Sequence, residues 1–301
     1  MIFLLATGCS KSKTSEPKSE KVISEKNLSK ADLNNSKSTF PEKTSPENSV
    51  KKKKEIVNKE ELEATLSIPE DNANFREYLP IFMFHYIKDI PSDTPDQLGY
   101  RLSFSPEKLE QFLVFFKENN IETLTFWDLK NIIEKKREFP KKAVMLTFDD
   151  GHIDHYQNAF RILKKHNAKG VFFIISGKPD NDHLYANWDQ IKEMSDQGQE
   201  IASHTISHLD LRNLSSEKIK QELEISKQVI EEKIGKPVIS FCYPAGKYNQ
   251  KVLEIVKENY LFARTTQAGK YFSIQKRHEI PTVRMFPETS VSSLKIWFDL
   301  R

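Results

Sequence analysis

The chain has 301 residues, of which 38% are hydrophobic and 30% are charged, and its formal net charge is +3. The basic excess is confined to residues 10–60, which hold 13 Lys, no Arg and 8 acidic residues, and a basic surplus outside the foldable part argues against a nucleic-acid-binding fold. No stretch after Cys9 is apolar for long enough to span a bilayer, which excludes an integral membrane protein.

The amino terminus, residues 1–9, is an apolar run that ends in small residues and Cys9. It resembles the lipobox of bacterial lipoproteins, although the positively charged region that opens a signal peptide is missing. The resemblance implies membrane attachment through a lipidated Cys9 and a lipid-anchored location in the cell envelope, on its periplasmic or extracellular face. An ordinary apolar terminus is the alternative.

Residues 10–74 are rich in Lys, Ser, Glu, Asn and Pro and hold too few apolar side chains to build a core. We therefore expect a disordered linker here. The remainder, residues 75–301, is long enough for one sizeable core and too short for two comfortable domains. We expect a single domain that acts as a monomer.

Within this domain, short β-branched or aromatic runs alternate with segments of helical period. The expected strands are 81–85, 121–124, 143–148, 170–175, 200–203, 238–242, 261–265 and 281–286. The expected helices are 106–119, 127–136, 156–166, 188–197, 215–234, 250–259 and 291–298. Repeated β-then-α units predict a parallel sheet. Seven or eight such strands favour an α/β fold of the (β/α) barrel type, a distorted seven-stranded TIM-like barrel, over an open doubly wound sheet.

Three short motifs that contain candidate functional residues each follow an expected strand. Asp149 and Asp150 end the first, His204 and His208 form the second, and the run 241–246 forms the third. Taken alone, paired acids before a glycine are more often a solvated turn, and two histidines four apart are more often coincidence. The carboxyl ends of barrel strands share one rim, however, so the fold brings all four side chains together.

One aspartate and two histidines are a ligand set suited to Zn²⁺ or a similar divalent ion with a position open for water. The second carboxylate is then free to act as a base on that water. No dinucleotide-binding or P-loop glycine motif is present, which weakens nucleotide-binding alternatives.

The motifs T-F-D-D-G at 147–151, S-H-T-x-x-H-x-x-L at 203–211 and F-x-Y-P-x-G-x-Y-N at 241–249 resemble the polysaccharide deacetylase family, the NodB homology domain of carbohydrate esterase family 4. The run that ends in His85 and Tyr86 resembles the opening strand of the branch that acts on poly-N-acetylglucosamine. The resemblance covers about residues 79–286.

The resemblance implies a role for each matching residue. Asp149 corresponds to the general base, and Asp150, His204 and His208 correspond to the metal ligands. Ala245 stands where the family has Tyr, and its backbone N–H corresponds to the group that stabilises the oxyanion.

Two positions depart from the family pattern. The late L-x-H motif that often supplies the general acid is missing; His278 precedes its strand, so we expect it on the wrong rim, and His85 is the preferred candidate. The Arg that normally orients the base is also missing, and Arg284 could replace it or form a structural salt bridge. The residues expected to bind substrate are Tyr243, Pro244, Tyr86 and Arg284.

The sequence thus predicts a hydrolase that uses a divalent metal, most simply Zn²⁺. The resemblance implies removal of N-acetyl groups from an N-acetylglucosamine-containing polysaccharide of the envelope or the exterior. A catalytically inactive carbohydrate-binding module and an O-acetyl esterase are the alternatives. The expected partner is the N-acetylated polysaccharide, and no nucleic-acid partner is expected.

Overall fold

The computed structural model describes residues 68–299. The expected signal segment, with Cys9, and residues 10–67 of the expected linker lie outside the described residues. Residues 68–74 were expected in the linker, but they contact the domain. The short 3₁₀ turn η1 (Glu70–Asn72) is fixed by the Asn72 side chain, which donates to the Ile133 carbonyl at 2.7 Å, and Ile68 packs against buried apolar side chains. The domain therefore begins before residue 75.

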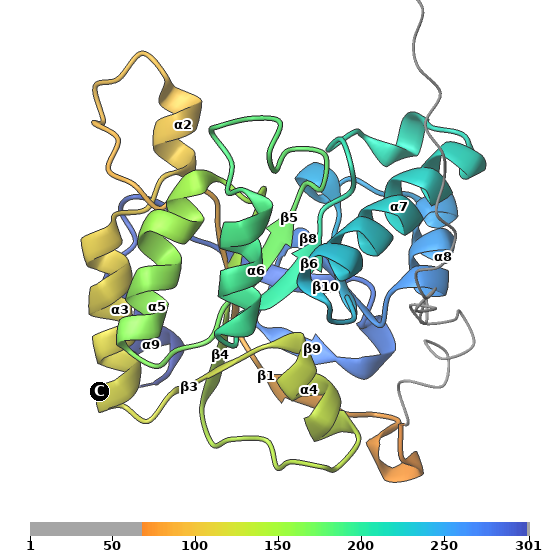
Figure 1. The fold of residues 1–301 in the computed structure, drawn as a ribbon. Helices are drawn as coiled ribbons and strands as arrows, with labels where there is room; N and C mark the ends of the chain where they lie inside the picture. The colour runs from red at the N-terminus through yellow and green to blue at the C-terminus, as the bar shows by residue number, and fades with distance from the viewer. Residues whose placement is uncertain (1–67, 300–301) are drawn as a thin grey trace, which may run out of the picture. The chain divides into compact units, whose positions relative to one another are not determined.

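Seven parallel strands close into a barrel (Figure 1). They pair in the order β2 (Ile81–Phe84), β10 (Ile280–Arg284), β8 (Phe262–Ala268), β7 (Ser240–Cys242), β6 (Glu200–Ser203), β5 (Val171–Ile174) and β4 (Ala143–Phe148), and β4 pairs back with β2. An eighth strand, β3 (Glu122–Leu124), pairs with the first half of β4. The expected distorted seven-stranded barrel is confirmed.

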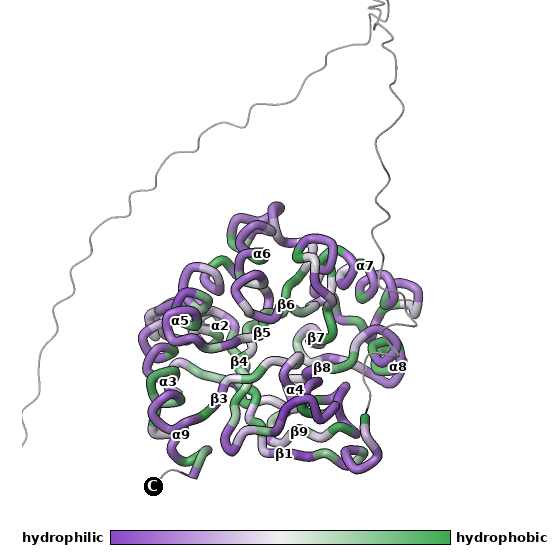
Figure 2. Tube along the Cα trace, turned by 60° about the horizontal axis from the view of Figure 1, so that its bottom comes forward, coloured by the Kyte–Doolittle hydropathy of each residue, from purple (hydrophilic) through white to green (hydrophobic). Residues whose placement is uncertain are grey.

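The helices follow the strands as expected. They are α3 (Pro106–Glu118), α4 (Phe126–Ile133), α5 (Arg161–Lys165) after the π-helical turn η2 (His155–Phe160), α6 (Trp188–Asp196), α7 (Ser216–Ile234), α8 (Gln250–Asn259) and α9 (Val291–Trp297). In Figure 2, α3, α5, α6, α7 and α8 surround the strands, and their outward turns are largely hydrophilic. None of the helices in the described part of the chain is long and apolar enough to cross a membrane.

Three short elements were not expected from the sequence. Helix α2 (Gln97–Leu102) has six residues, and β1 (Arg76–Tyr78) and β9 (Tyr271–Ser273) form an antiparallel ribbon of three residues each. Elements of this length are too short to develop a helical or alternating pattern, and they form because neighbouring elements hold them.

Packing in the core fixes the backbone position at the end of β4. All six residues of β4 are buried, as expected for a parallel strand with packed faces on both sides. The Phe148 ring stacks between the rings of Phe84 and Phe172, with centroids 5.2 and 4.7 Å away. Asp149 follows directly, so its backbone position is set by this packing.

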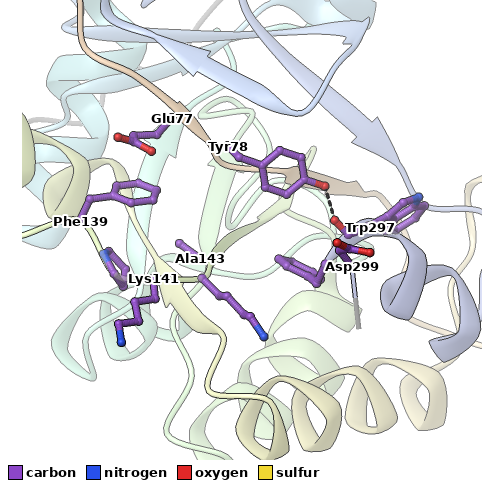
Figure 3. Close-up of a pocket in the computed structure, with 10 residues that line it drawn as sticks. Glu77, Tyr78, Phe139, Lys141, Ala143, Trp297 and Asp299 are labelled. Carbon is purple, nitrogen blue, oxygen red and sulfur yellow. Dashed lines mark hydrogen bonds between the residues drawn. The ribbon is translucent and has the colours of Figure 1, made fainter. Parts of the chain in front are cut away.

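A cavity of about 610 Å³ lies at the amino ends of the strands (Figure 3). Its walls come from β1, from the segment that leads into β4 and from the end of α9, and the Tyr78 hydroxyl donates to the Trp297 carbonyl at 2.5 Å. None of its lining residues is a predicted site residue. The predicted site residues lie at the opposite rim, where the strands have their carboxyl ends.

A buried carboxyl group ties three elements together at the amino end. Glu200, the first residue of β6, is 5% exposed and accepts hydrogen bonds from the Phe126 backbone N–H at 2.7 Å and from the Ser240 hydroxyl at 2.6 Å. Burial raises the pKa of Glu200 to about 7, and these hydrogen bonds only partly offset it.

This raised pKa makes stability depend on pH. The folded protein holds a proton on Glu200 that the unfolded chain releases near pH 4.5, so stability is lost as pH rises through 4.5 toward about 7. We expect Glu200→Gln to be more stable than the parent at pH 8, by about 2 kcal/mol, with a much smaller difference at pH 5. Urea unfolding at both pH values measures this. The exposed Glu254 supplies the control, Glu254→Gln, and an equal gain at both pH values would contradict the prediction.

Candidate active site

Four of the predicted side chains meet at the carboxyl rim of the barrel. Asp149 and Asp150 follow β4, and His204 and His208 follow β6. The Nε2 atoms of His204 and His208 lie 3.4 and 3.6 Å from Asp150 Oδ1. The ligand atoms of these last three residues all lie within 4.8 Å of one another, so they could hold one metal ion.

The chemistry of this donor set fits a divalent ion. His204 Nδ1 donates to the Cys242 carbonyl at 2.7 Å, which fixes the ring so that Nε2 is directed at Asp150 and is the nitrogen available to a metal. The side chains of Asp150 and His208 are 18% and 37% exposed, so the cluster is open on one side. A second group of three, Asp149, His204 and Cys242, is fully buried and holds a guanidinium against the sulfur, which competes with a cation.

Three residues in the loops after β4 and β6, which carry the candidate metal ligands, have left-handed backbone angles. The φ values are 82° for Asp150, 68° for Thr205 and 57° for His208, and such an angle is unusual for a β-branched residue. Thr205 Oγ1 accepts from the His208 backbone N–H at 2.9 Å, and the Glu222 carboxylate of α7 accepts from two further N–H groups of the loop at 3.0 Å. These bonds hold strained residues at the place where their side chains converge.

Asp149 forms an ion pair in the interior of the barrel. Its partner is the guanidinium of Arg264 in β8, and the two residues are 2% and 0% exposed. Burial alone would raise the pKa of Asp149, but the charge of Arg264, with smaller effects from His85 and His204, holds it below its ordinary value. Asp149 is therefore ionised.

This pairing corrects an expectation. Arg284 was considered as the partner of Asp149, but the pair is formed by Arg264, which lies beside Cys242 in the register of β7 and β8. Arg284 ends β10 on the same rim, is half-buried and makes no ion pair with any residue between 68 and 299. A signal for Arg264 was present, because a charged residue inside an apolar barrel strand must be paired.

His85 lies beside Asp149. Its Nε2 atom is 3.9 Å from Asp149 Oδ2, and its side chain is 17% exposed. Burial lowers the pKa of His85, and the two aspartates only partly oppose this shift, so the imidazole is neutral. His278 lies elsewhere, with Nε2 bonded to the Tyr260 carbonyl at 2.8 Å.

The third motif positions backbone rather than side chains. Tyr243 is fully buried and its hydroxyl donates to the His278 carbonyl at 3.0 Å, and Pro244 is buried as well, so neither offers the surface that the expected substrate contacts require. Ala245 is exposed in a tight turn, with φ 52°. The hydrogen bonds of this turn are donated by Gly246 and Lys247.

Gly246 is required by its surroundings. Its φ is +69°, and a Cβ atom at this position would lie 2.0 Å from the Thr266 hydroxyl oxygen. Only glycine permits the turn to approach β8 so closely and to present Ala245 on the rim.

Comparisons with known proteins agree with this geometry. A family profile described as Polysaccharide deacetylase matches residues 136–261. YxkH of Bacillus subtilis, whose name places it among the polysaccharide deacetylases, is 30% identical over 222 residues, which are 73% of this chain and 76% of that protein. The chain belongs to the polysaccharide deacetylase family.

Further relatives of this deacetylase are similar over different lengths. The poly-beta-1,6-N-acetyl-D-glucosamine N-deacetylase of Staphylococcus aureus is 31% identical over 175 residues, which cover 52% of this chain and 58% of that protein. The structure of the Streptococcus pyogenes deacetylase PplD, in complex with acetate, superposes with a TM-score of 0.68 and 28% identity. It covers 74% of this chain and 99% of that one. The profile match includes all three motifs.

The buried ion pair of this deacetylase can be tested by removing its cation. Arg264→Met leaves an ionised carboxylate in the core, so we expect it to reduce the free energy of unfolding by about 3–5 kcal/mol. Asp149→Asn in the same background should recover part of that loss, because the uncompensated charge is gone. Urea unfolding of both single variants and the double variant measures the coupling.

The exposed pair Arg212–Asp210 supplies the control. Arg212→Met should leave the free energy of unfolding nearly unchanged, because solvent screens that pair. A cost for Arg264→Met no larger than this would contradict the structural account of Asp149.

Proposed function

We propose that the protein removes N-acetyl groups from an N-acetylglucosamine-containing polysaccharide, with a divalent metal, Zn²⁺, held by Asp150, His204 and His208. The observation that carries the proposal is the buried, ionised Asp149 next to an open O,N,N ligand set. A base beside a metal site serves hydrolysis and is of no use to a module that only binds. The Staphylococcus aureus relative is a poly-beta-1,6-N-acetyl-D-glucosamine N-deacetylase, which supports this class of glycan as the substrate.

In this proposal Asp149 is the general base. Arg264 holds its Oδ1, and Oδ2 remains on the side of His85, 3.9 Å from the imidazole. A divalent ion in the neighbouring site would polarise the acetyl carbonyl and make water a better nucleophile at neutral pH. Asp149 accepts the proton that the water loses as it attacks the carbonyl carbon. The Ala245 N–H, outside both hydrogen bonds of its turn, donates to the oxyanion.

His85 is the proposed general acid. An amine leaves a tetrahedral intermediate only when its nitrogen is protonated, and His85 shares the rim with Asp149. A neutral imidazole can relay the proton that Asp149 gained. Tyr86, which follows His85 in the loop after β2, and Arg284, which ends β10 opposite Met83, are proposed to contact the glycan.

We also propose that the enzyme is anchored to a membrane by a lipid. A lipid on Cys9, followed by the Lys-rich stretch at 10–60, would hold the catalytic domain at a membrane surface while it reaches an envelope or exterior glycan. We propose a monomer, since the described domain contains every proposed catalytic residue on one chain.

The base can be tested directly. Asp149→Asn should lower the rate of acetate release from N-acetylglucosamine oligomers by at least 10²-fold, because the group that accepts the proton is lost. Enzyme stripped with a chelator should be inactive and should recover with Zn²⁺ or Co²⁺. Acetate release is measured on partially acetylated poly-N-acetylglucosamine, chitooligosaccharides and O-acetylated glycan. A metal-loaded parent that is silent on all of them is a binding module, and one that is active only on the O-acetylated glycan is an esterase.

The acid has a separate signature. His85→Gln should reduce acetate release from the N-acetylated glycan by about 10²–10⁴-fold. The loss should be much smaller for 4-nitrophenyl acetate, whose phenolate departs without protonation. Comparing kcat for the two substrates measures this. Equal losses on amide and ester would show that His85 has another role.

A further inference from the structure

Two tyrosine rings contact the imidazole of His152, which lies on the rim outside the predicted ligand set. Its ring centroid lies 4.4 Å from that of Tyr86 and 4.8 Å from that of Tyr185. Ammonium groups cover the outer rings, with Lys88 Nζ 4.2 Å from the Tyr86 centroid and Lys178 Nζ 4.9 Å from the Tyr185 centroid. These five side chains form what we call the His152 stack, and they come from the loops after β2, β4 and β5.

The backbone reinforces the stack. His152 and Tyr185 form an isolated antiparallel bridge. On either side of the bridge, the Ile153 N–H donates to the Leu184 carbonyl at 2.9 Å and the Ala186 N–H donates to the Gly151 carbonyl at 3.0 Å. The loop that carries Asp150 is therefore bonded to the loop that leads into α6, and the imidazole has little freedom to turn.

The fixed imidazole lies against a predicted metal ligand. His152 Nε2 is 3.4 Å from Asp150 Oδ2, and its side chain is 10% exposed. The other oxygen, Oδ1, lies near His204 and His208 at 3.4 and 3.6 Å. The two oxygens of Asp150 thus have different neighbours. The set of ligand atoms within 4.8 Å of one another includes Asp150, His204 and His208 but not His152.

We propose that His152 is a positioning residue that holds Asp150 by its second oxygen, so that Oδ1 stays directed at the metal, and that Tyr86 and Tyr185 hold His152 in turn. This inference rests on the metal site of the proposed function. It requires a proton on Nε2, since an ionised carboxylate only accepts hydrogen bonds. Residues that orient a metal ligand commonly change metal affinity by 10–100-fold when they are replaced.

Two substitutions at His152 separate the hydrogen bond from the stack. His152→Phe keeps an aromatic ring between the tyrosines and removes the donor, and His152→Gln removes the ring and keeps an N–H group near the position of Nε2. We expect His152→Phe to weaken Zn²⁺ and Co²⁺ binding by about tenfold or more. His152→Gln should recover most of the affinity. The dissociation constants are measured on metal-free full-length protein by competition with a chromophoric chelator.

Substitutions at Tyr185 test the support of the imidazole. Tyr185→Phe keeps the stacked ring and should bind metal as the parent does. Tyr185→Leu frees one side of His152 and should weaken binding, by less than His152→Phe does. His166→Phe is the matched control, because His166 contacts Glu110 at 2.9 Å, away from the rim, and its loss should leave the affinity unchanged.

Two results would overturn the proposal. The first is a His152→Phe variant that binds both metals as tightly as the parent. The second is a His152→Gln variant that is as weak as His152→Phe and has an altered Co²⁺ absorption spectrum, which would make His152 a direct ligand. A loss of metal affinity supports the proposal only where the metal-free variant keeps the Tm of the parent. If His152→Phe lowers the Tm, the comparison of Tyr185→Phe with Tyr185→Leu decides instead.

The affinity series also separates this inference from the proposed function. If the parent binds metal tightly and releases no acetate from any glycan, the deacetylase proposal fails and the ranking of affinities still tests His152. If acetate is released normally and affinity is the same in all variants, the proposed function stands and the inference fails.

Discussion

The ion pair between Asp149 and Arg264 is the interaction on which the rest of the site depends. Two adjacent carboxylates at the end of a buried strand repel each other and lose their hydration, which would raise the pKa of at least one of them. Arg264 compensates the charge of Asp149 from inside the barrel, so Asp149 stays ionised without a metal ion beside it. The second carboxylate, Asp150, is left for a cation from outside.

The division of roles between the two aspartates follows from the backbone. Asp149 continues the line of β4, so its side chain points into the barrel toward β7 and β8. At Asp150 the chain turns, with φ 82°, and the next carboxylate is directed at the loop after β6. One residue of sequence separation thereby places two chemically identical groups in a buried environment and in a half-open one, which is how a base and a ligand can coexist.

How far the sequence predicts this arrangement depends on the length of the pattern involved. The barrel follows from eight apolar runs separated by helical segments, and Asp149, Asp150, His204 and His208 follow from their places at strand ends, where parallel topology gathers them. The place of Arg264 in an apolar strand signals that it must be paired, but its partner lies 115 residues away in the chain, so no local pattern shows which carboxylate it meets. Tyr243 was misjudged for a similar reason, since its hydroxyl is satisfied by His278 on a distant segment.

Different contacts hold the two ends of the barrel. At the amino end, the Glu200 carboxyl group joins β6, β7 and α4 by hydrogen bonds. At the carboxyl end, the left-handed residues and the His152 stack belong to short loops, and several hydrogen bonds join these loops to one another. Such loops can keep a strained geometry only because α7, through Glu222, and the loop before α6 hold them from outside the barrel. The helical layer and the loops beside it thus support the proposed metal site from outside the barrel.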